Sequence, residues 1–77
     1  MKYYDRQAIR AFLSDPRVRP LLSWRGIEKA AGLNPYTIKN LVRQDKALSD
    51  QEHERLTETL VMLGIDYWAE SLAKQNA

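Results

Sequence analysis

The sequence predicts an all-α protein, a compact bundle of about five short helices, and three observations lead to this fold class. No segment alternates apolar and polar residues over the length of a strand, and no Asn-Gly or Asp-Gly hairpin signal occurs. Apolar residues recur instead at spacings of three and four, the period of an amphipathic helix. Residues that favour helix starts and glycines that favour helix ends then divide the chain into short segments.

The first expected helix follows Asp5 and runs to about Leu13 or Ser14. Asp5 is a favourable N-cap, because its carboxylate can accept hydrogen bonds from unpaired N–H groups of the first turn. Ile9 and Leu13 lie four residues apart and therefore on one side of this helix. Segment 15–20 contains two prolines, and each disfavours helix in the residue before it. We therefore expect the helix to end there and a short turn to follow.

The second and third helices are expected on either side of a glycine. Ser23 is a good N-cap for the second helix, and Gly32 can end it by taking a positive φ. Asn34 is a good cap for the third helix, and Pro35 is favoured at the first helical position. That helix is expected to run to about Arg43.

Two further helices are expected in the C-terminal part. Ser49 and Glu52 have the spacing of a capping box, in which each side chain bonds the backbone N–H of the other. The fourth helix follows them and is expected to stop before Gly64. Asp66 is the expected cap of a last short helix that reaches about Lys74. We expect one domain over residues 1–77, because a chain of this length does not divide further.

Residues 23–43 form the most informative segment. The two helices expected there are separated by only three residues, so they should cross steeply, with a small apolar wedge between them. This spacing predicts the geometry of a helix-turn-helix, whose second helix can enter the major groove of DNA. The apolar positions of the wedge are Ile27, Ala31, Leu33, Ile38 and Leu41.

These residues, SWRGIEKAAGLNPYTIKNLVR, resemble the helix-turn-helix of the lambda-repressor-like (Cro/C1-type, XRE-like) DNA-binding proteins of bacteria and phages. The resemblance covers about 22–65, with Gly32 as the turn glycine. Two features depart from the family pattern. Glu28 stands where the family usually has a small residue, so its carboxylate must reach solvent or a partner. The connection after Arg43 lacks the glycine often found there. The resemblance implies a prokaryotic or phage transcriptional regulator.

Roles in DNA binding follow if the fold is as expected. Helix 34–43 would present its N-terminal face to base edges, where asparagine pairs with adenine and lysine with guanine. The base-reading positions implied by the resemblance are Pro35, Tyr36, Lys39 and Asn40. Contacts to the DNA backbone are expected from Ser23, Trp24, Arg25, Thr37, Arg43 and Lys46. The alternative is that the cations only form a solvated helix face and that Trp24 is a half-buried core residue.

The charges are distributed unevenly along the chain. Residues 1–46 hold ten basic and four acidic side chains, whereas 47–77 hold two basic and six acidic ones. This pattern favours one face for a polyanion such as double-stranded DNA, although a mixed soluble surface is the simpler interpretation. No cysteine is present, and His53, the single histidine, lacks partners for a metal site. We expect no enzyme activity, no metal and no cofactor or small-molecule substrate.

Segment 61–74 carries a second apolar stripe, at spacings of four, three and four. It packs back over the core on one interpretation and forms a homodimer interface on the other, since tryptophan and tyrosine are favoured interface anchors. A dimer would place two recognition helices about 34 Å apart, one turn of DNA. A rival function is a protein-interaction module, such as an antitoxin or adaptor, that binds its partner through this stripe. The stripe consists of Val61, Ile65, Trp68 and Leu72.

The sequence also contains no apolar run near the roughly 20 residues that a membrane helix needs. No apolar stretch follows the basic residue at the N-terminus, so no signal peptide is expected. We therefore expect a cytoplasmic protein without a membrane partner.

Overall fold

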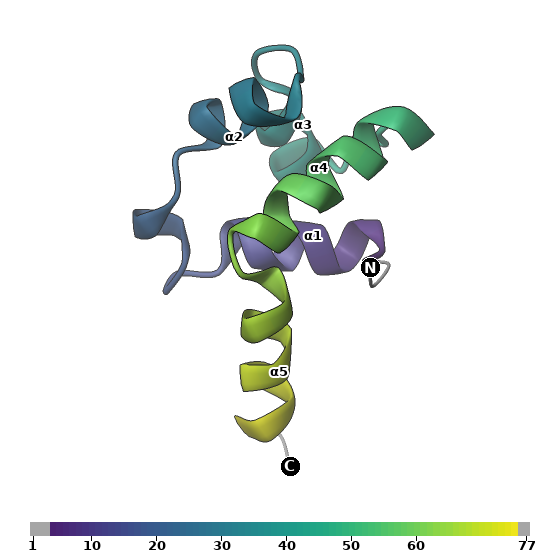
Figure 1. Cartoon of the computed structure of the whole chain (residues 1–77). Coiled ribbons are helices and arrows are strands. Elements are labelled where there is room, and N and C mark those ends of the chain that lie inside the picture. Colours follow the sequence, from purple (N-terminus) through teal and green to yellow (C-terminus); the bar gives the residue numbers. More distant parts are fainter. Residues whose placement is uncertain (1–3, 76–77) are drawn as a thin grey trace.

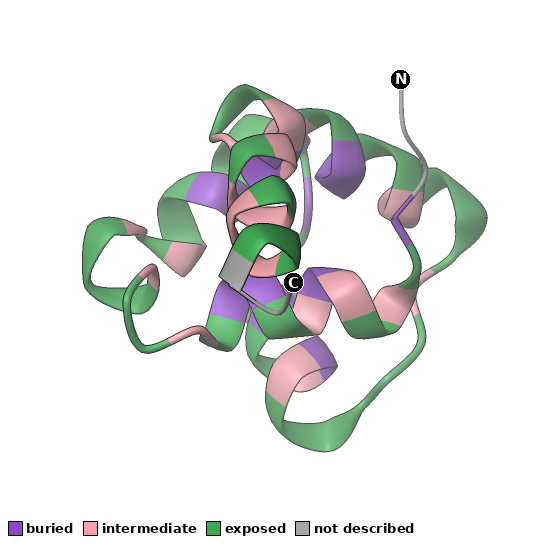
Figure 2. Cartoon of the chain, turned by 90° about the horizontal axis from the view of Figure 1, so that it is seen from below, coloured by how far each residue is buried: buried purple, intermediate pink, exposed green. Residues whose placement is uncertain are grey.

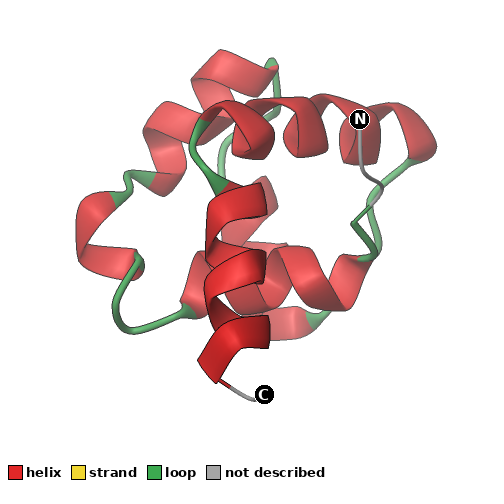
Figure 3. Ribbon diagram, turned by 60° about the horizontal axis from the view of Figure 1, so that its bottom comes forward, coloured by secondary structure: helices red, strands yellow, loops and turns green. Residues whose placement is uncertain are grey.

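The computed structural model describes residues 4–75, which are helical with short loops and contain no strand (Figure 3). The expected all-α bundle of five helices is confirmed, with one 3-10 helix, η1, added in the proline-containing segment. None of the helices within the described residues combines the length and apolar character that a membrane crossing requires. The elements in order are α1 (Arg6–Ser14), η1 (Arg19–Leu21), α2 (Trp24–Ala31), α3 (Thr37–Gln44), α4 (Asp50–Met62) and α5 (Ile65–Gln75).

Different helices form the two ends of the molecule (Figure 1). α2 and α3 lie together at one end, α1 and α4 occupy the middle, and α5 extends to the other end. α2 packs against both α3 and α4, while α1 packs against α3 and α4 adjoins α5. The molecule is accordingly elongated, with principal extents of 37 × 26 × 21 Å.

One apolar core joins these helices, and its buried residues gather where the helices face one another (Figure 2). All five apolar residues predicted for the wedge between α2 and α3 belong to it. Tyr4 and the inner side of α1 add further apolar residues, and α4 and α5 add the rest. The buried apolar residues are Tyr4, Ile9, Phe12, Leu13, Ile27, Ala31, Leu33, Ile38, Leu41, Leu56, Leu60 and Ile65.

Local caps set most helix ends where the sequence predicts them. Asp5 accepts a hydrogen bond from the N–H of Ala8 at 2.8 Å and so begins α1. The hydroxyl of Ser23 accepts from the N–H of Gly26 at 3.1 Å at the start of α2. Gly32 ends α2 with a φ of 71°, a backbone conformation that favours glycine. The capping box of Ser49 and Glu52 is formed as expected, and it caps the start of α4.

The start of α3 is wrong in the sequence-based prediction. The helix begins at Thr37 and not at Asn34-Pro35, so five residues, 32–36, separate it from α2. Tyr36 has a φ of 67° and a ψ of 4°, the conformation of the third residue of a type II turn, for which proline is common in the position before it. The carbonyl of Asn34 accepts from the N–H of Thr37 at 3.3 Å. Asn34 and Pro35 therefore form a turn in front of the helix.

The start of α5 also differs from the prediction. The helix begins at Ile65, and the carbonyl of Gly64 accepts the N–H of Trp68 at 3.0 Å, so Asp66 lies inside the first turn and is not the cap. The carboxylate of Asp66 instead accepts a hydrogen bond from the hydroxyl of Tyr4. A bond across 62 residues of chain has no local sequence signal, and it therefore escaped the prediction.

Candidate nucleic-acid interface

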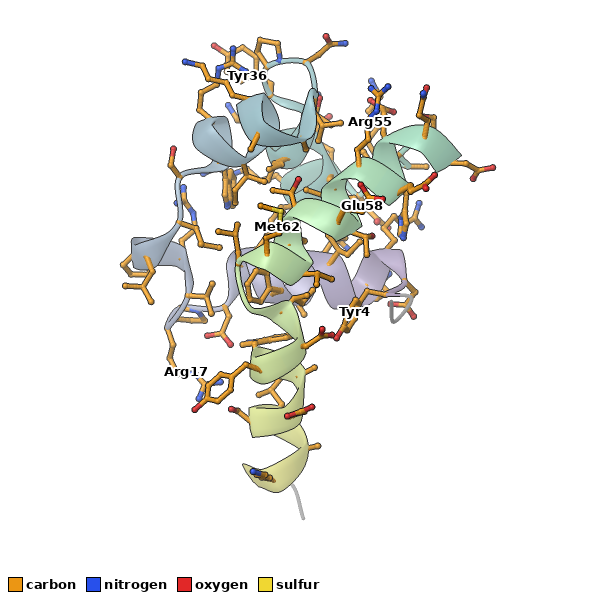
Figure 4. All side chains as sticks on the ribbon, in the orientation of Figure 1. Tyr4, Arg17, Tyr36, Arg55, Glu58 and Met62 are labelled. Carbon is orange, nitrogen blue, oxygen red and sulfur yellow. The ribbon has the colours of Figure 1, made fainter. Side chains whose placement is uncertain are left out.

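The first turn of α2 and the start of α3 meet around an open surface hollow of about 360 Å³. Figure 4 shows Tyr36, one of its lining residues, at the end of the molecule opposite α5. Two helix starts from separate elements thus converge on one place. The lining residues are Trp24, Arg25, Glu28, Pro35, Tyr36 and Lys39, and all except Glu28 are predicted DNA-contacting residues.

An aromatic ring and a cation lie side by side at the rim of this hollow. The side chain of Tyr36 is exposed, at 67% for the whole residue. The ammonium nitrogen of Lys39 lies 5.8 Å from the centre of its ring, within the range of a cation–π contact. Asn40 follows on the same helix and is half-buried. The outward groups at the start of α3 are therefore one ring, one ammonium and one partly accessible amide.

Further cations lie along and after α3. Lys39 and Arg43 are four residues apart and lie on the same exposed face of the helix. Among residues 4–75, no ion pair is formed by either of them or by Lys46. Thr37 is half-buried, and its hydroxyl donates to the carbonyl of Asn34 at 2.7 Å. The three cations are thus available to interact with solvent or a ligand, whereas the hydroxyl of Thr37 is used in a hydrogen bond within the turn.

Trp24 is anchored to the body of the molecule. Its indole N–H donates to the carbonyl of Leu13 at 3.3 Å, and the guanidinium of Arg19 lies 4.0 Å from the centre of its ring. The residue is half-buried, packed against the core. Arg25 beside it has a side chain that is 51% exposed. At the start of α2, a phosphate would therefore contact Arg25 and backbone N–H groups, and not the indole N–H of Trp24.

Glu28 is the lining residue to which sequence reasoning gave no role in the site. It is 3% exposed, and its Oε2 accepts a hydrogen bond from the backbone N–H of Ile38 at 2.9 Å. Its Oε1 lies 3.7 Å from a guanidinium nitrogen of Arg25. The partner that this carboxylate requires is thus the first turn of α3. The available signal was that Glu28 departs from the small residue usual in the family that the sequence resembles, but nothing local indicated which N–H group its carboxylate would accept from.

The opposite end of α3 is held by charge as well. Asp45 follows the helix with a φ of 52°, the left-handed conformation for which a glycine would be favoured. Its carboxylate lies 3.2 Å from Arg6 and 3.3 Å from Arg10. Arg10 also donates to the carbonyl of Val42 at 3.0 Å, in the last turn of the helix. Asp45 therefore holds a conformation that glycine would favour, and its charge is matched by two arginines of α1.

The predicted dimer stripe is largely part of the core of this chain. Ile65 is fully buried, so its assignment to an interface with a second chain is wrong. The ring of Trp68 meets that of Phe12 edge-on, with centroids 5.3 Å apart. Val61 is half-buried against the core, as is Trp68, and Leu72 is half-buried on α5. The exposed large apolar residues near the junction of α4 and α5 are instead Met62, Leu63 and Tyr67.

Two hydrogen bonds attach α5 to the N-terminal part, and each shifts the pKa of one of the groups that it joins. The indole N–H of Trp68 donates to Asp15 at 2.7 Å, which, with Arg17, lowers the pKa of Asp15 to about 2. The hydroxyl of Tyr4 donates to the carboxylate of Asp66, and this bond, with burial, raises the pKa of Tyr4 to about 12. Both shifts favour the protonation state that keeps the bond.

Comparison with known proteins adds no relative to this description. No protein-family model matches the chain, and no match is found among curated proteins or solved structures.

Proposed function

We propose that the chain is a small sequence-specific DNA-binding protein, a transcriptional regulator of prokaryotic or phage type, that places α3 in the major groove. It acts by occupying a site in double-stranded DNA, without chemistry and without a cofactor. The observation that carries the proposal is the convergence at the hollow. There, the start of α2, with Arg25, meets the start of α3, with Tyr36 and Lys39, at one exposed end of the molecule.

The chemistry of these groups supports a division of labour on DNA. Lys39 is suited to the acceptors of guanine, and Asn40 to adenine. Tyr36 offers a ring for a thymine methyl group and a hydroxyl for a phosphate. The N-terminus of α2 favours a phosphate, because it carries the positive end of the helix dipole and Arg25 adds a positive charge.

The acidic residues within this region support the proposal as well. Glu28 is buried and therefore contributes no exposed carboxylate to the face around the hollow. Asp45 is paired with two arginines, so its charge is locally compensated. Lys39 and Arg43 form no ion pair with any of the described residues, so both can meet phosphates, and each such contact releases counterions from the DNA.

The first test is fluorescence anisotropy of a labelled random-sequence duplex over a range of salt concentrations. We expect a Kd in the micromolar range, with log K falling steeply as log salt rises. Lys39→Glu should abolish binding, whereas Lys74→Glu, the same charge change at an exposed position of α5, should alter it little. No binding by the wild-type chain even at low salt would refute the proposal.

A second test addresses sequence specificity. On a duplex selected for tight binding, Asn40→Ala should cost about 1–3 kcal/mol while affinity for random DNA stays the same. Equal losses on selected and random duplexes would show that Asn40 contacts the DNA backbone or supports the fold.

Homodimer formation is part of the proposal, and it implies a roughly palindromic DNA site. Because Ile65 is buried, the contact would use the exposed residues Met62, Leu63 and Tyr67. The same exposed group is the specific observation that favours the rival function, a protein-interaction module such as an antitoxin or adaptor. Sedimentation of the wild type and of Met62→Glu separates the two: loss of a dimer in the variant supports self-association. A monomeric wild type that binds no DNA favours a different protein partner.

A further inference from the structure

The carboxylate of Glu28 is the one buried charged group among the described residues, since Thr57 is the only other buried polar residue there. Burying a carboxylate without partners is strongly unfavourable, so its contacts must compensate. Glu28 has two of them, the N–H of Ile38 at 2.9 Å and the guanidinium of Arg25 at 3.7 Å. These contacts lie on different elements, one in α3 and one at the exposed start of α2.

α3 lacks a side-chain cap of its own. Its N-cap residue is Tyr36, which makes no capping hydrogen bond. The first N–H groups of a helix have no partner within the helix, and they carry the positive end of its dipole. Ile38 is the second residue of α3, so its N–H is one of these groups. Glu28 therefore supplies from α2 the negative cap that α3 does not provide.

We propose that Glu28 is the positioning residue of this interface. Its buried carboxylate fixes the first turn of α3 against α2, and this holds Tyr36 and Lys39 in a set arrangement beside Arg25. The expected effect on DNA binding rests on the proposed function, whereas the positioning of α3 does not. The residue contacts no DNA itself, because it is nearly inaccessible.

Two substitutions separate the hydrogen bond from the charge. In Glu28→Gln the amide oxygen can still accept from Ile38, although the charge next to Arg25 is gone. In Glu28→Ala both are lost, and the N–H of Ile38 is left without its partner. Glu54, an exposed residue of α4, offers matched controls in Glu54→Gln and Glu54→Ala.

The bond itself can be measured in the unmodified chain. In isotope-labelled protein, NMR should detect a coupling across the hydrogen bond between the amide nitrogen of Ile38 and the side-chain carboxyl carbon of Glu28. The amide hydrogen of Ile38 should exchange with solvent at least tenfold more slowly than in Glu28→Ala. Absence of the coupling together with equal exchange in both proteins would overturn the inference, whether or not the chain binds DNA.

The consequence for DNA is measured on the selected duplex. We expect Glu28→Ala to weaken binding at least tenfold there, with a smaller loss on random DNA, because base reading depends more on the orientation of α3 than phosphate contact does. Glu28→Gln should restore most of the affinity and most of the protection of Ile38. The Glu54 variants should match the wild type.

The possible failures are distinguishable. If the wild type binds no duplex, the proposed function falls, and the exchange of Ile38 still decides the positioning role. If the wild type binds and Glu28→Ala binds each duplex as tightly as the wild type does, the positioning role is refuted and the proposed function stands. If Glu28→Ala does not fold, the coupling in the wild type and the rescue by Glu28→Gln supply the decision.

Discussion

α3 and α5 are both attached to the body of the molecule, but by different means. α3 buries Ile38 and Leu41 in the core and is also held at its two ends by charged side chains of other helices, Glu28 at the start and Arg10 at the finish. α5 is held along its side, by the burial of Ile65 and by the contacts of Trp68. Attachment at the ends leaves the outer face of α3 open to a ligand. Attachment along the side buries the apolar face of α5 that the sequence offered as a dimer interface.

The largest expected effect tests how much each helix contributes to the core. Leu41 of α3 is fully buried, whereas Leu72 of α5 is half-buried. Leu41→Ala should lower the free energy of unfolding by about 2–5 kcal/mol, through lost burial and the cavity left behind. Leu72→Ala should lower it by roughly half as much or less, because less area returns to water. Urea unfolding followed by circular dichroism measures both. An equal loss for the two would mean that α5 is as much a part of the core as α3.

The two tryptophans sharpen the comparison, because both donate to the end of α1. Trp24 donates to a neutral carbonyl, that of Leu13, and Trp68 to the carboxylate of Asp15. Hydrogen bonds to charged groups contribute about 1.5–3 kcal/mol and neutral ones about 0.5–1.5 kcal/mol. Trp68→Phe should therefore cost roughly 1 kcal/mol more than Trp24→Phe in urea unfolding. The reverse order would indicate that the contact of Arg19 with Trp24 dominates.

Acid should loosen the attachment of α5. The pKa of Asp15 is lowered from 3.8 to about 2, so its carboxylate stabilises the folded chain above about pH 4. That contribution is lost as the pH falls through the folded-state value. The urea midpoint of the wild type should therefore fall between pH 4 and pH 2 more steeply than that of Asp15→Asn. Parallel curves for the two proteins would show that the Trp68 bond does not depend on the charge.

Base should give a smaller effect at the other attachment of α5. The pKa of Tyr4 is raised from 10.0 to about 12, so its contribution is complete below pH 10 and is lost as the pH rises through the folded-state value. The absorbance of tyrosinate, titrated in the wild type and in Tyr4→Phe, should differ by one step near pH 12. A difference step near pH 10 would mean that Tyr4 does not donate to Asp66 in solution.

The sequence was sufficient for features with local signals. The bounds of α2 were predicted correctly because Ser23 and Gly32 act within one turn of the helix ends. Asn34-Pro35 misled the prediction, since the same dipeptide starts either a helix or a turn. The left-handed backbone conformation of Tyr36 makes it a turn here. The helix start moved, but five of the ten predicted DNA-contacting residues still line one hollow: Trp24, Arg25, Pro35, Tyr36 and Lys39.

Features that depend on distant residues could not be predicted. The spacing from Val61 to Leu72 is the same whether the stripe meets its own core or a second chain, and only the packed helices show that Ile65 and Trp68 face inward. The role of Glu28 needed the position of Ile38, ten residues away on another helix. The sequence marked Glu28 as unusual, and the fold supplied the reason.

Tyr36 keeps a bulky side chain at a backbone conformation that glycine or asparagine would adopt with less strain. A strained residue of this kind persists only where the surrounding structure or a purpose maintains it. A library of variants at position 36 selected for thermal stability alone should therefore drift toward glycine and asparagine. The same library selected for ligand binding should keep an aromatic ring at this position. The frequency of aromatic residues after the binding selection, compared with that after the stability selection, then measures how much the ring contributes to binding.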